Sequence, residues 1–244
     1  MLEATARAED LHFWFRSLRR NAAWLLDRAG AGATGGTVVD AGAGTGRDLE
    51  WLGRYGRVIG VELNQSGVAV ARRLGRPMLR ATVTALPVPD ASVDLVTSFD
   101  VIYCLEDGDE RTALAEMFRV LKPGGLALVN AAALDLLHGS HSTLTHEVRR
   151  YTRVRLTERL TSAGFGIERL TYTNMLTFPP TLAVRLLDRI TGRAGRASEA
   201  ELRVPPRALN ALLDAVLKVE HRLVRRFDLP IGTSLLCLAR KPGG

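Results

Sequence analysis

The segment from Val38 to Gly46 constrains the fold of this chain more than any other. It reads Val-Val-Asp-Ala-Gly-Ala-Gly-Thr-Gly, an apolar strand that runs into three alternating glycines and then into a helical pattern. Glycine is needed where a backbone turns tightly and where a ligand approaches the main chain closely. The segment therefore predicts a ligand-binding turn between a strand and a helix.

Apolar runs alternate with helical patterns on both sides of this turn. Strands are expected at 37–41, 57–62, 78–81, 93–99, 125–130, 167–173 and 233–239. Helices are expected at 8–29, 47–55, 67–74, 111–121, 156–163 and 207–227, and Lys122–Gly125 is expected to be a turn. Such alternation predicts βαβ units, and hence an α/β fold with a mostly parallel sheet.

The spacing of the glycines separates two classes of cofactor. Dinucleotide-binding folds use G-x-G-x-x-G, whose third glycine would stand at position 47, where this chain has Arg47. The loop instead reads G-x-G-x-G, and Asp40 precedes its first glycine by two residues. A carboxylate there repels a pyrophosphate but suits a ligand that carries an ammonium and a sulfonium group.

This loop resembles that of the class I S-adenosylmethionine-dependent methyltransferases. Three further segments are similar to the family and follow in the same order: the acid Glu62 at the end of the next strand, the stretch 85–96, and the turn at 118–125. Val93 stands where the family usually has Phe. The resemblance covers residues 38–130.

The resemblance implies a Rossmann-like, mostly parallel sheet of seven strands with an antiparallel last strand, helices on both faces and a helical insertion before the last strand. The expected parts are an N-terminal helical lid at 1–36, a cofactor-binding domain at 37–174 and 231–244, and the insertion at 175–230. The insertion is expected to cover the acceptor, to form an oligomer contact, or to rest on anionic lipid.

The family's cofactor is S-adenosyl-L-methionine, which leaves as S-adenosyl-L-homocysteine. By resemblance, an acid at Glu62 accepts hydrogen bonds from both ribose hydroxyls. The aromatic residues and arginines of the N-terminal helix fit a lid whose arginine could bind the cofactor carboxylate; alternatively, Trp14 and Phe15 pack in the core and the arginines are solvated. Thr82 replaces an acid that often binds the adenine amine, and its hydroxyl could accept the same bond. The residues expected to bind the cofactor are Asp40, Ala41, Gly42, Gly44, Glu62, Leu63, Thr82, Val83, Phe99, Arg16 and Arg20.

The segment 138–151 is similar to an H-D-x-x-x-x-H-x-R-R-Y pattern of a bacterial methyltransferase subgroup, with Ser142 in place of its Asp. The candidate catalytic residues are His141, His146, Tyr103 and Tyr151. A histidine here would touch the acceptor or act as a base near neutral pH. Alternatively, these residues cap helices and anchor a loop. A metal site is a third interpretation, but no Cys or carboxylate is spaced to complete one, and no metal is expected.

Charge and cysteine content limit the partners. The formal net charge is +7, yet only three of the 33 basic residues are lysines, which is typical of a GC-rich genome. The N/D-P-P-Y/F motif of base methylation is absent from 98–101, which disfavours a nucleic-acid substrate. Two cysteines support no disulfide framework, and neither a signal peptide nor an apolar run of membrane-spanning length is present, so a cytoplasmic protein is expected.

The expected function is methyl transfer to a small-molecule acceptor of natural-product or prenyl or lipid-like character. The alternatives are a protein that binds S-adenosylmethionine without methylating, with a cyclase-like or regulatory role, and a nucleic-acid methyltransferase. The chain is expected to be a monomer or a homodimer, and residues 207–226 are a candidate for peripheral membrane contact.

Overall fold

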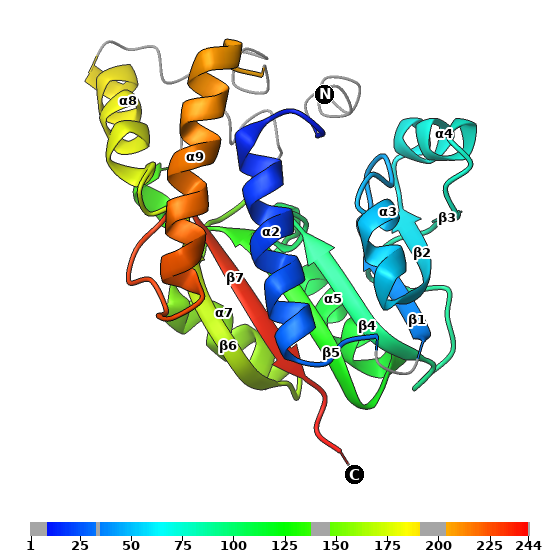
Figure 1. The fold of residues 1–244 in the computed structure, drawn as a ribbon. Coiled ribbons are helices and arrows are strands. Elements are labelled where there is room, and N and C mark those ends of the chain that lie inside the picture. The colour runs from blue at the N-terminus through cyan, green and yellow to red at the C-terminus, as the bar shows by residue number, and fades with distance from the viewer. Residues whose placement is uncertain (1–8, 33–34, 138–146, 191–203, 244) are drawn as a thin grey trace.

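A computed structural model of the chain describes residues 9–32, 35–137, 147–190 and 204–243. Its seven strands form one sheet in the order β3-β2-β1-β4-β5-β7-β6 (Figure 1). The strands are β1 (Gly36–Ala41), β2 (Gly56–Glu62), β3 (Met78–Arg80), β4 (Val93–Phe99), β5 (Leu121–Ala132), β6 (Gly166–Thr173) and β7 (Ser234–Arg240). The helices are α2 (Phe13–Arg28), α3 (Leu49–Leu52), α4 (Gln65–Arg73), α5 (Asp107–Val120), α7 (Arg153–Ser162), α8 (Phe178–Ile190) and α9 (Arg207–Val224), with short turns η1 (Gly53–Tyr55), η2 (Ile102–Cys104) and η3 (Asp135–Leu137).

Strands β3, β2, β1, β4 and β5 are parallel to one another, whereas β7 runs antiparallel to both β5 and β6. The prediction of a Rossmann-like sheet with an antiparallel last strand is therefore confirmed. Strand β1 lies between β2 and β4, so the order of the strands reverses beside it. In open α/β sheets this reversal opens a crevice at the carboxyl ends of the strands, where ligands bind.

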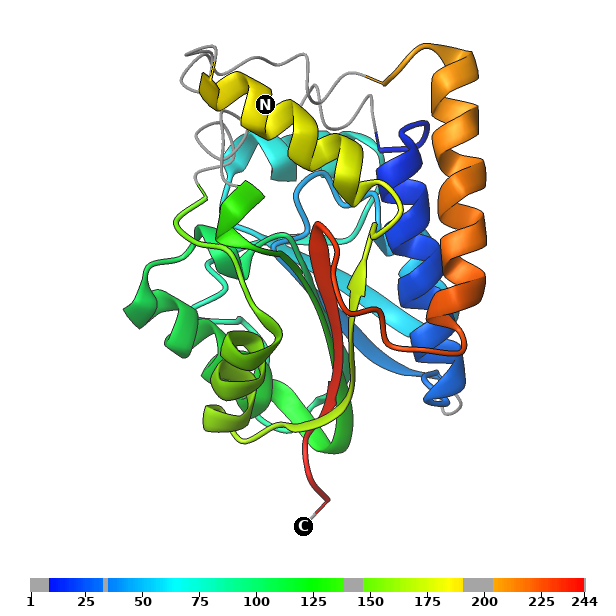
Figure 2. The ribbon, with the colours of Figure 1, turned by 90° about the vertical axis from the view of Figure 1, so that its left-hand side faces the viewer.

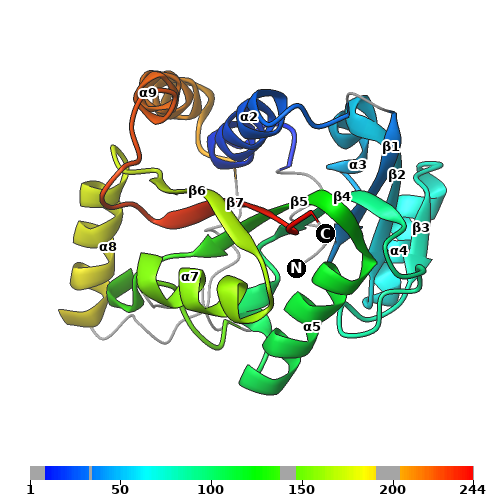
Figure 3. The ribbon, with the colours of Figure 1, turned by 90° about the horizontal axis from the view of Figure 1, so that it is seen from below.

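Alternate strand residues fill two cores on opposite faces of the sheet. On one face, Val39 and Val129 belong to the core that also contains Leu114 of α5 and Leu156 of α7. On the other face, the neighbouring strand residues pack with Leu25 of α2. Figure 3 shows α2 and α9 on one side of the sheet and α5 and α7 on the other. The period-two pattern of strands explains this division, because successive side chains point to opposite faces.

Helix α8 was not predicted from the sequence. Pro179 and Pro180 fall in the first turn of α8, where a missing backbone N–H leaves no helical hydrogen bond unmade. Helix α8 packs against η3, which follows β5. No helix within the described ranges is long and apolar enough to cross a membrane.

Two further boundaries differ from the prediction. Strand β5 begins at Leu121 rather than after the expected turn, and Leu121 pairs with Val93 before the register shifts. The turn survives as a distortion inside the strand, because Gly124 adopts a φ of 80° that other residues rarely reach. The helix expected at 47–55 divides into α3 and η1.

Helices α2 and α9 form one layer, in which they lie side by side (Figure 2). The two helices are joined around Asp214 of α9, which is 3% exposed. Its carboxylate pairs with Arg20 at 2.8 Å, with Arg16 at 3.4 Å and with Lys218 at 2.9 Å. Because one buried acid receives three cations, it fixes how α9 packs on α2.

We predict that Asp214→Ala destabilises the fold by roughly 2 kcal/mol, less than for a fully buried pair because its arginine partners stay partly exposed. The free energy of unfolding measured in urea tests this. Asp228→Ala is the matched control, since Asp228 forms one exposed ion pair with Arg169 and its loss is expected to cost less than about 1 kcal/mol. Equal effects of the two substitutions would contradict the role given to Asp214.

Candidate active site

The glycine loop follows β1 at the point where the sheet order reverses. The backbone amides of Gly42 and Ala43 both donate to the carbonyl of Val61, at 2.8 and 2.9 Å, which holds the turn against β2. Gly42 has a φ of 87°, and a Cβ atom there would lie 2.2 Å from a methyl group of Val101. No other residue fits this position, so the loop keeps its main chain open to a ligand.

Asp40 is buried at the end of β1, and its Oδ1 atom accepts a hydrogen bond of 2.6 Å from the hydroxyl of Thr97. The pKa of Asp40 is raised to about 8, mainly by burial. The negative charges of Asp48, Glu62 and Glu9 contribute to this rise, whereas the hydrogen bond from Thr97 lowers the pKa. The carboxyl group is therefore held in a place where its ionised form lacks a compensating cation.

Glu62 ends β2 beside the same loop. Its Oε2 atom accepts from the amide of Gly44 at 2.9 Å, and its Oε1 atom accepts from the amide of Asn64 at 2.7 Å. These two bonds fix the carboxylate. A carboxylate has about four lone-pair sites, so each oxygen can accept one bond more. The arrangement suits a ligand with two neighbouring hydroxyl groups.

The segment before α2 contributes residues that the sequence analysis did not identify. The carboxylate of Glu9 accepts from the hydroxyl of Thr45 at 2.7 Å, and Asp10 pairs with Arg47. Burial raises the pKa of Glu9, and the charge of Asp48 adds to this effect. The glycine loop is thus surrounded by acids from four segments of the chain, an environment that favours a positively charged ligand.

Arg19 is the arginine of α2 that meets this loop. Its Nε atom donates to Asp48 at 2.8 Å, and its Nη2 atom is buried without a hydrogen-bond partner among the described residues. Arg19 also lines a hollow of about 280 Å³ with Arg47, Glu50 and Trp51. A buried guanidinium with an unused donor is suited to a ligand carboxylate.

Arg16 and Arg20 lie elsewhere. Both pair with Asp214 of α9, so their placement does not support the predicted contact with a cofactor carboxylate. The two residues are four positions apart and share one face of α2, whereas Arg19 projects about 100° round the helix from Arg20. The sequence shows arginines in this helix, but only the packing of α2 on α9 decides which of them faces the loop.

A second polar cluster lies at the carboxyl ends of β4 and β5. Asp100 follows β4 with a φ of 61°, and the side-chain amide of Asn130 donates to its Oδ1 atom at 2.9 Å. Burial raises the pKa of Asp100 to about 7, with contributions from Asp48 and Glu147, although bonds from Asn130 and Tyr103 lower it. The Oδ1 atom of Asn130 is buried and has no partner among the described residues.

The predicted catalytic residues divide between two places. Tyr103 is buried beside Asp100 and thus reaches the site. Tyr151 is fully buried, and its hydroxyl donates to Glu110 of α5 at 2.6 Å. Glu110 also pairs with Arg149 at 2.8 Å. The geometry of Tyr151 fits the alternative interpretation, in which it anchors a loop. His141 and His146 lie outside the described residues.

The remaining predicted cofactor residues gather at the same end of the sheet. Leu63 follows Glu62 and is 63% exposed, which leaves an apolar surface beside the carboxylate. The hydroxyl of Thr82 lies 2.8 Å from that of Thr84, and Phe99 ends β4. Within the described ranges, no three His, Cys, Asp or Glu side chains gather in a way that could hold a metal ion.

Comparisons with known proteins agree with this geometry. The model of the methyltransferase domain family matches residues 39–129. A probable S-adenosylmethionine-dependent methyltransferase of Mycolicibacterium smegmatis is 35% identical over 162 residues, which cover 64% of this chain and 61% of that protein. A malonyl-acyl-carrier-protein O-methyltransferase of Coxiella burnetii is 40% identical over 107 residues, which cover 43% of this chain and 37% of that protein.

Among solved structures, the cyclase SpnF superimposes with a TM-score of 0.60 at 24% identity, covering 95% of this chain and 83% of the other, a likeness that shows the fold alone. The family match coincides with the glycine loop, Glu62 and β4. Residues 39–129 form a methyltransferase domain similar to those of S-adenosylmethionine-dependent methyltransferases. It spans less than two thirds of the length of the curated relatives named above.

The methyltransferase domain fits the family's cofactor in the chemistry of its groups. S-adenosylmethionine carries an ammonium, a sulfonium, a ribose diol and a carboxylate. The acids around the glycine loop match the two cations, Glu62 has lone pairs left for the diol, and the unused donor of Arg19 matches the carboxylate. These matches are between chemical groups, and each assigns a testable role to one side chain.

We predict that Arg19→Ala lowers the affinity for S-adenosylhomocysteine about ten- to a hundred-fold, the range expected for a lost hydrogen bond to a charged group. Titration calorimetry measures this directly. Arg20→Ala is the matched control in the same helix and is expected to bind normally. Asp48→Asn breaks the pair with Arg19 from the other side, so equal losses in Arg19→Ala and Asp48→Asn would assign the effect to the pair rather than to the ligand.

Proposed function

We propose that this chain transfers a methyl group from S-adenosylmethionine to a small, mainly apolar acceptor molecule. The observation that carries the proposal is the glycine loop of the methyltransferase domain, ringed by the carboxylates of Asp40, Glu62, Glu9 and Asp48. Arg19 pairs with Asp48, and the charges of Arg19 and Arg76 offset that of Glu9 only in part, because the pKa of Glu9 remains raised. A cationic cofactor relieves this repulsion, whereas a pyrophosphate increases it.

The cofactor supplies an electrophilic methyl group on a positively charged sulfur. Transfer is an in-line displacement, and the protein's task is to align the acceptor and to exclude water. In this chain, Asp40 and Glu62 would position the ammonium and ribose groups at the loop, and Arg19 the carboxylate. The acceptor would then approach from the side of β4 and β5, where the second polar cluster lies.

Asp100 is the residue placed to take up the acceptor's proton. It is held by Asn130 and Tyr103 in a left-handed backbone conformation that non-glycine residues rarely adopt. A carboxyl group with a pKa of about 7 is half ionised at neutral pH, which suits a general base. The unpartnered Oδ1 atom of Asn130 offers a second acceptor for a hydroxyl or amine of the substrate.

An apolar acceptor is favoured by the helix that covers this end of the sheet. Helix α8 lies across the carboxyl ends of the strands in Figure 2 and packs against η3. The side chains described for α8 include Val184, Leu187 and Ile190, which are 54, 59 and 82% exposed. An acceptor of natural-product, prenyl or lipid-like character matches such surroundings better than a nucleic acid does.

The first test is binding of S-adenosylhomocysteine, which retains the ammonium group. A bound cation lowers the pKa of Asp40 from about 8, so binding below that pH releases a proton. Affinity is therefore expected to rise with pH up to about 8 and then to level off. Calorimetry in buffers of different ionisation enthalpy counts the released protons, and Asp40→Asn should abolish their release. An affinity that stays flat as pH approaches 8 would contradict the role of Asp40.

The second test concerns the acceptor. Incubation with S-adenosylmethionine and a panel of apolar hydroxyl and amine compounds is expected to yield S-adenosylhomocysteine together with a methylated product. A chain that binds the cofactor but forms neither with any member of the panel would favour the alternative of a binding or regulatory protein. Release of S-adenosylhomocysteine only with DNA or RNA would favour a nucleic-acid methyltransferase.

For an acceptor found in this way, we predict that Asp100→Asn lowers kcat about a hundred-fold or more, the usual contribution of a general base. The wild-type rate should rise as pH passes about 7, where Asp100 ionises, and the variant should lose this dependence. Affinity for S-adenosylhomocysteine should remain unchanged. Asp90→Asn is the control, because Asp90 is an exposed surface acid. A pH profile that survives in Asp100→Asn would exclude Asp100 as the base.

A further inference from the structure

Helix α9 has an unusual distribution of charge between its two faces. Its inner face contacts α2 and buries both of its acids, Asp214 and Glu220, which are 3 and 0% exposed. Asp214 receives cations from α2, as described above. The carboxylate of Glu220 accepts from the backbone amides of Asn174 and Leu176, at 2.5 and 2.8 Å. Both acids of α9 are therefore buried and bound to groups inside the protein.

The outer face of α9 carries only apolar and basic side chains. Leu209, Leu212 and Val219 are 46, 60 and 48% exposed. Its remaining exposed residues are alanines, arginines and one lysine. An exposed face of this composition leaves large apolar side chains in water with no acid among them. Soluble surfaces usually mix both signs of charge, so this face is suited to a partner that is apolar and anionic.

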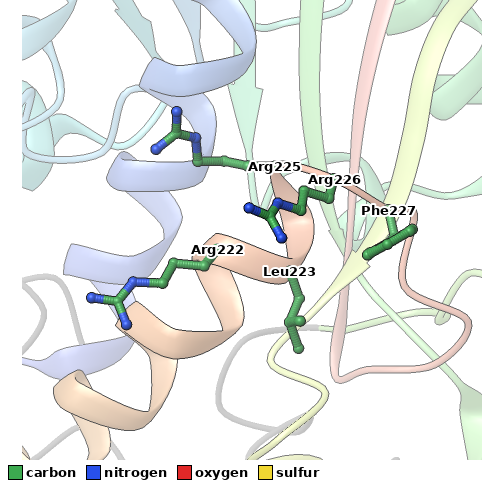
Figure 4. A pocket seen from close by; sticks show the side chains of 5 residues that line it. All are labelled: Arg222, Leu223, Arg225, Arg226 and Phe227. Carbon is green, nitrogen blue, oxygen red and sulfur yellow. The ribbon is translucent and has the colours of Figure 1, made fainter.

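The basic residues concentrate at the end of α9. Arg222, Arg225 and Arg226, together with Leu223 and Phe227, line a hollow of about 470 Å³ (Figure 4). No side-chain hydrogen bond or ion pair joins the three guanidinium groups to the part of the chain that the structure describes. Phe227 is 63% exposed beside them. Three unpaired arginines in a short stretch that also exposes an aromatic ring form a site suited to phosphate groups at an apolar boundary.

We propose that the outer face of α9 docks on an anionic lipid membrane. Its apolar side chains would enter the boundary between headgroups and acyl chains, and Arg222, Arg225 and Arg226 would bind lipid phosphates. The docking itself does not depend on which acceptor is methylated.

The composition of the surface favours a membrane over two other partners. A nucleic acid matches the arginines but leaves Leu212 and Val219 without an apolar partner. A second copy of the chain would bring the same face against itself. That face carries no exposed acid on α9, so the arginines would be buried without counter-charges. A lipid surface supplies both the phosphates and the apolar medium.

Sedimentation with vesicles tests the proposal. Wild-type protein is mixed with vesicles of phosphatidylcholine alone or of equal parts phosphatidylcholine and phosphatidylglycerol. The salt concentration is about 0.1 M, where the screening length is about 10 Å, or about 1 M, where it is about 3 Å. Binding is expected for the anionic vesicles at low salt and is expected to weaken strongly at high salt. Absence of binding to anionic vesicles at low salt would overturn the proposal.

Variants locate the surface. Replacing Arg222, Arg225 and Arg226 by Gln should lower the partition coefficient about a hundred-fold, from about five-fold for each arginine. Leu212→Ser combined with Val219→Ser should lower it about ten-fold or more. The control replaces Arg57, Arg72 and Arg73 by Gln, a set of equal charge that is exposed on β2 and α4. Thermal melting followed by circular dichroism verifies that each variant is folded.

Each remaining outcome is decisive. Equal losses in the control and in the α9 triple variant would mean that binding follows net charge, which overturns the assignment to α9. A concentration-dependent dimer that Leu212→Ser abolishes, without vesicle binding, would make this face a self-association surface. Binding to duplex DNA that removes the protein from vesicles and depends on the same arginines would make it a nucleic-acid surface. Normal binding of S-adenosylhomocysteine by the α9 variant separates this test from that of the methyltransferase function.

Discussion

The buried carboxyl group of Asp40 is the constraint around which the site is arranged. It lies at the end of β1, where the sheet order reverses, and the hydroxyl of Thr97 holds it in place. Glu62, at the end of β2, faces the same loop through the amide of Gly44. Bringing these like charges together destabilises the folded protein, because burial and repulsion both disfavour the ionised form of Asp40 and raise its pKa. Sites that bind cations are built in this way, since the ligand supplies the charge that the protein omits.

Two other buried acids have a structural role, because each accepts several hydrogen bonds or ion pairs from the protein itself. Asp214 receives three cations, and Glu220 receives backbone amides from the segment before α8. Together they attach α9 to the rest of the fold through its inner face. The result is that α9 contributes no acid to the protein surface, and its outer face takes its character from leucines and arginines alone. Packing inside the molecule therefore determines the chemistry of the surface outside it.

Sequence patterns predicted the parts of the structure that depend on local spacing. The glycine loop, the strand alternation and Glu62 follow from the positions of residues along the chain, so the sheet and its ligand-binding edge could be derived. The role of individual side chains could not be derived from the sequence, because it depends on neighbours that are brought together only by the tertiary fold. Tyr151 follows a run of candidate polar residues, yet its hydroxyl is buried on Glu110. Arg19 and Arg20 are adjacent in sequence, and only the docking of α9 directs one to the loop and the other to Asp214. Helix α8 could not be predicted from the sequence, because two prolines occupy its first turn and prolines usually interrupt helices.

The meaning of the net charge of +7 depends on where the basic residues lie in the structure, not on their number. Near the glycine loop, acids outnumber the cations that reach them, so the basic excess has no part in attracting the cofactor. Many arginines elsewhere are paired, as Arg119 is with Glu116 and Arg149 with Glu110. The arginines at the end of α9 are different, because the acids of their own helix are buried and used. The acids at the glycine loop and the arginines at the end of α9 would therefore bind ligands of opposite charge at separate places on one molecule. The two groups disturb each other little, because charges farther apart than the screening length of about 8 Å interact only weakly through solvent.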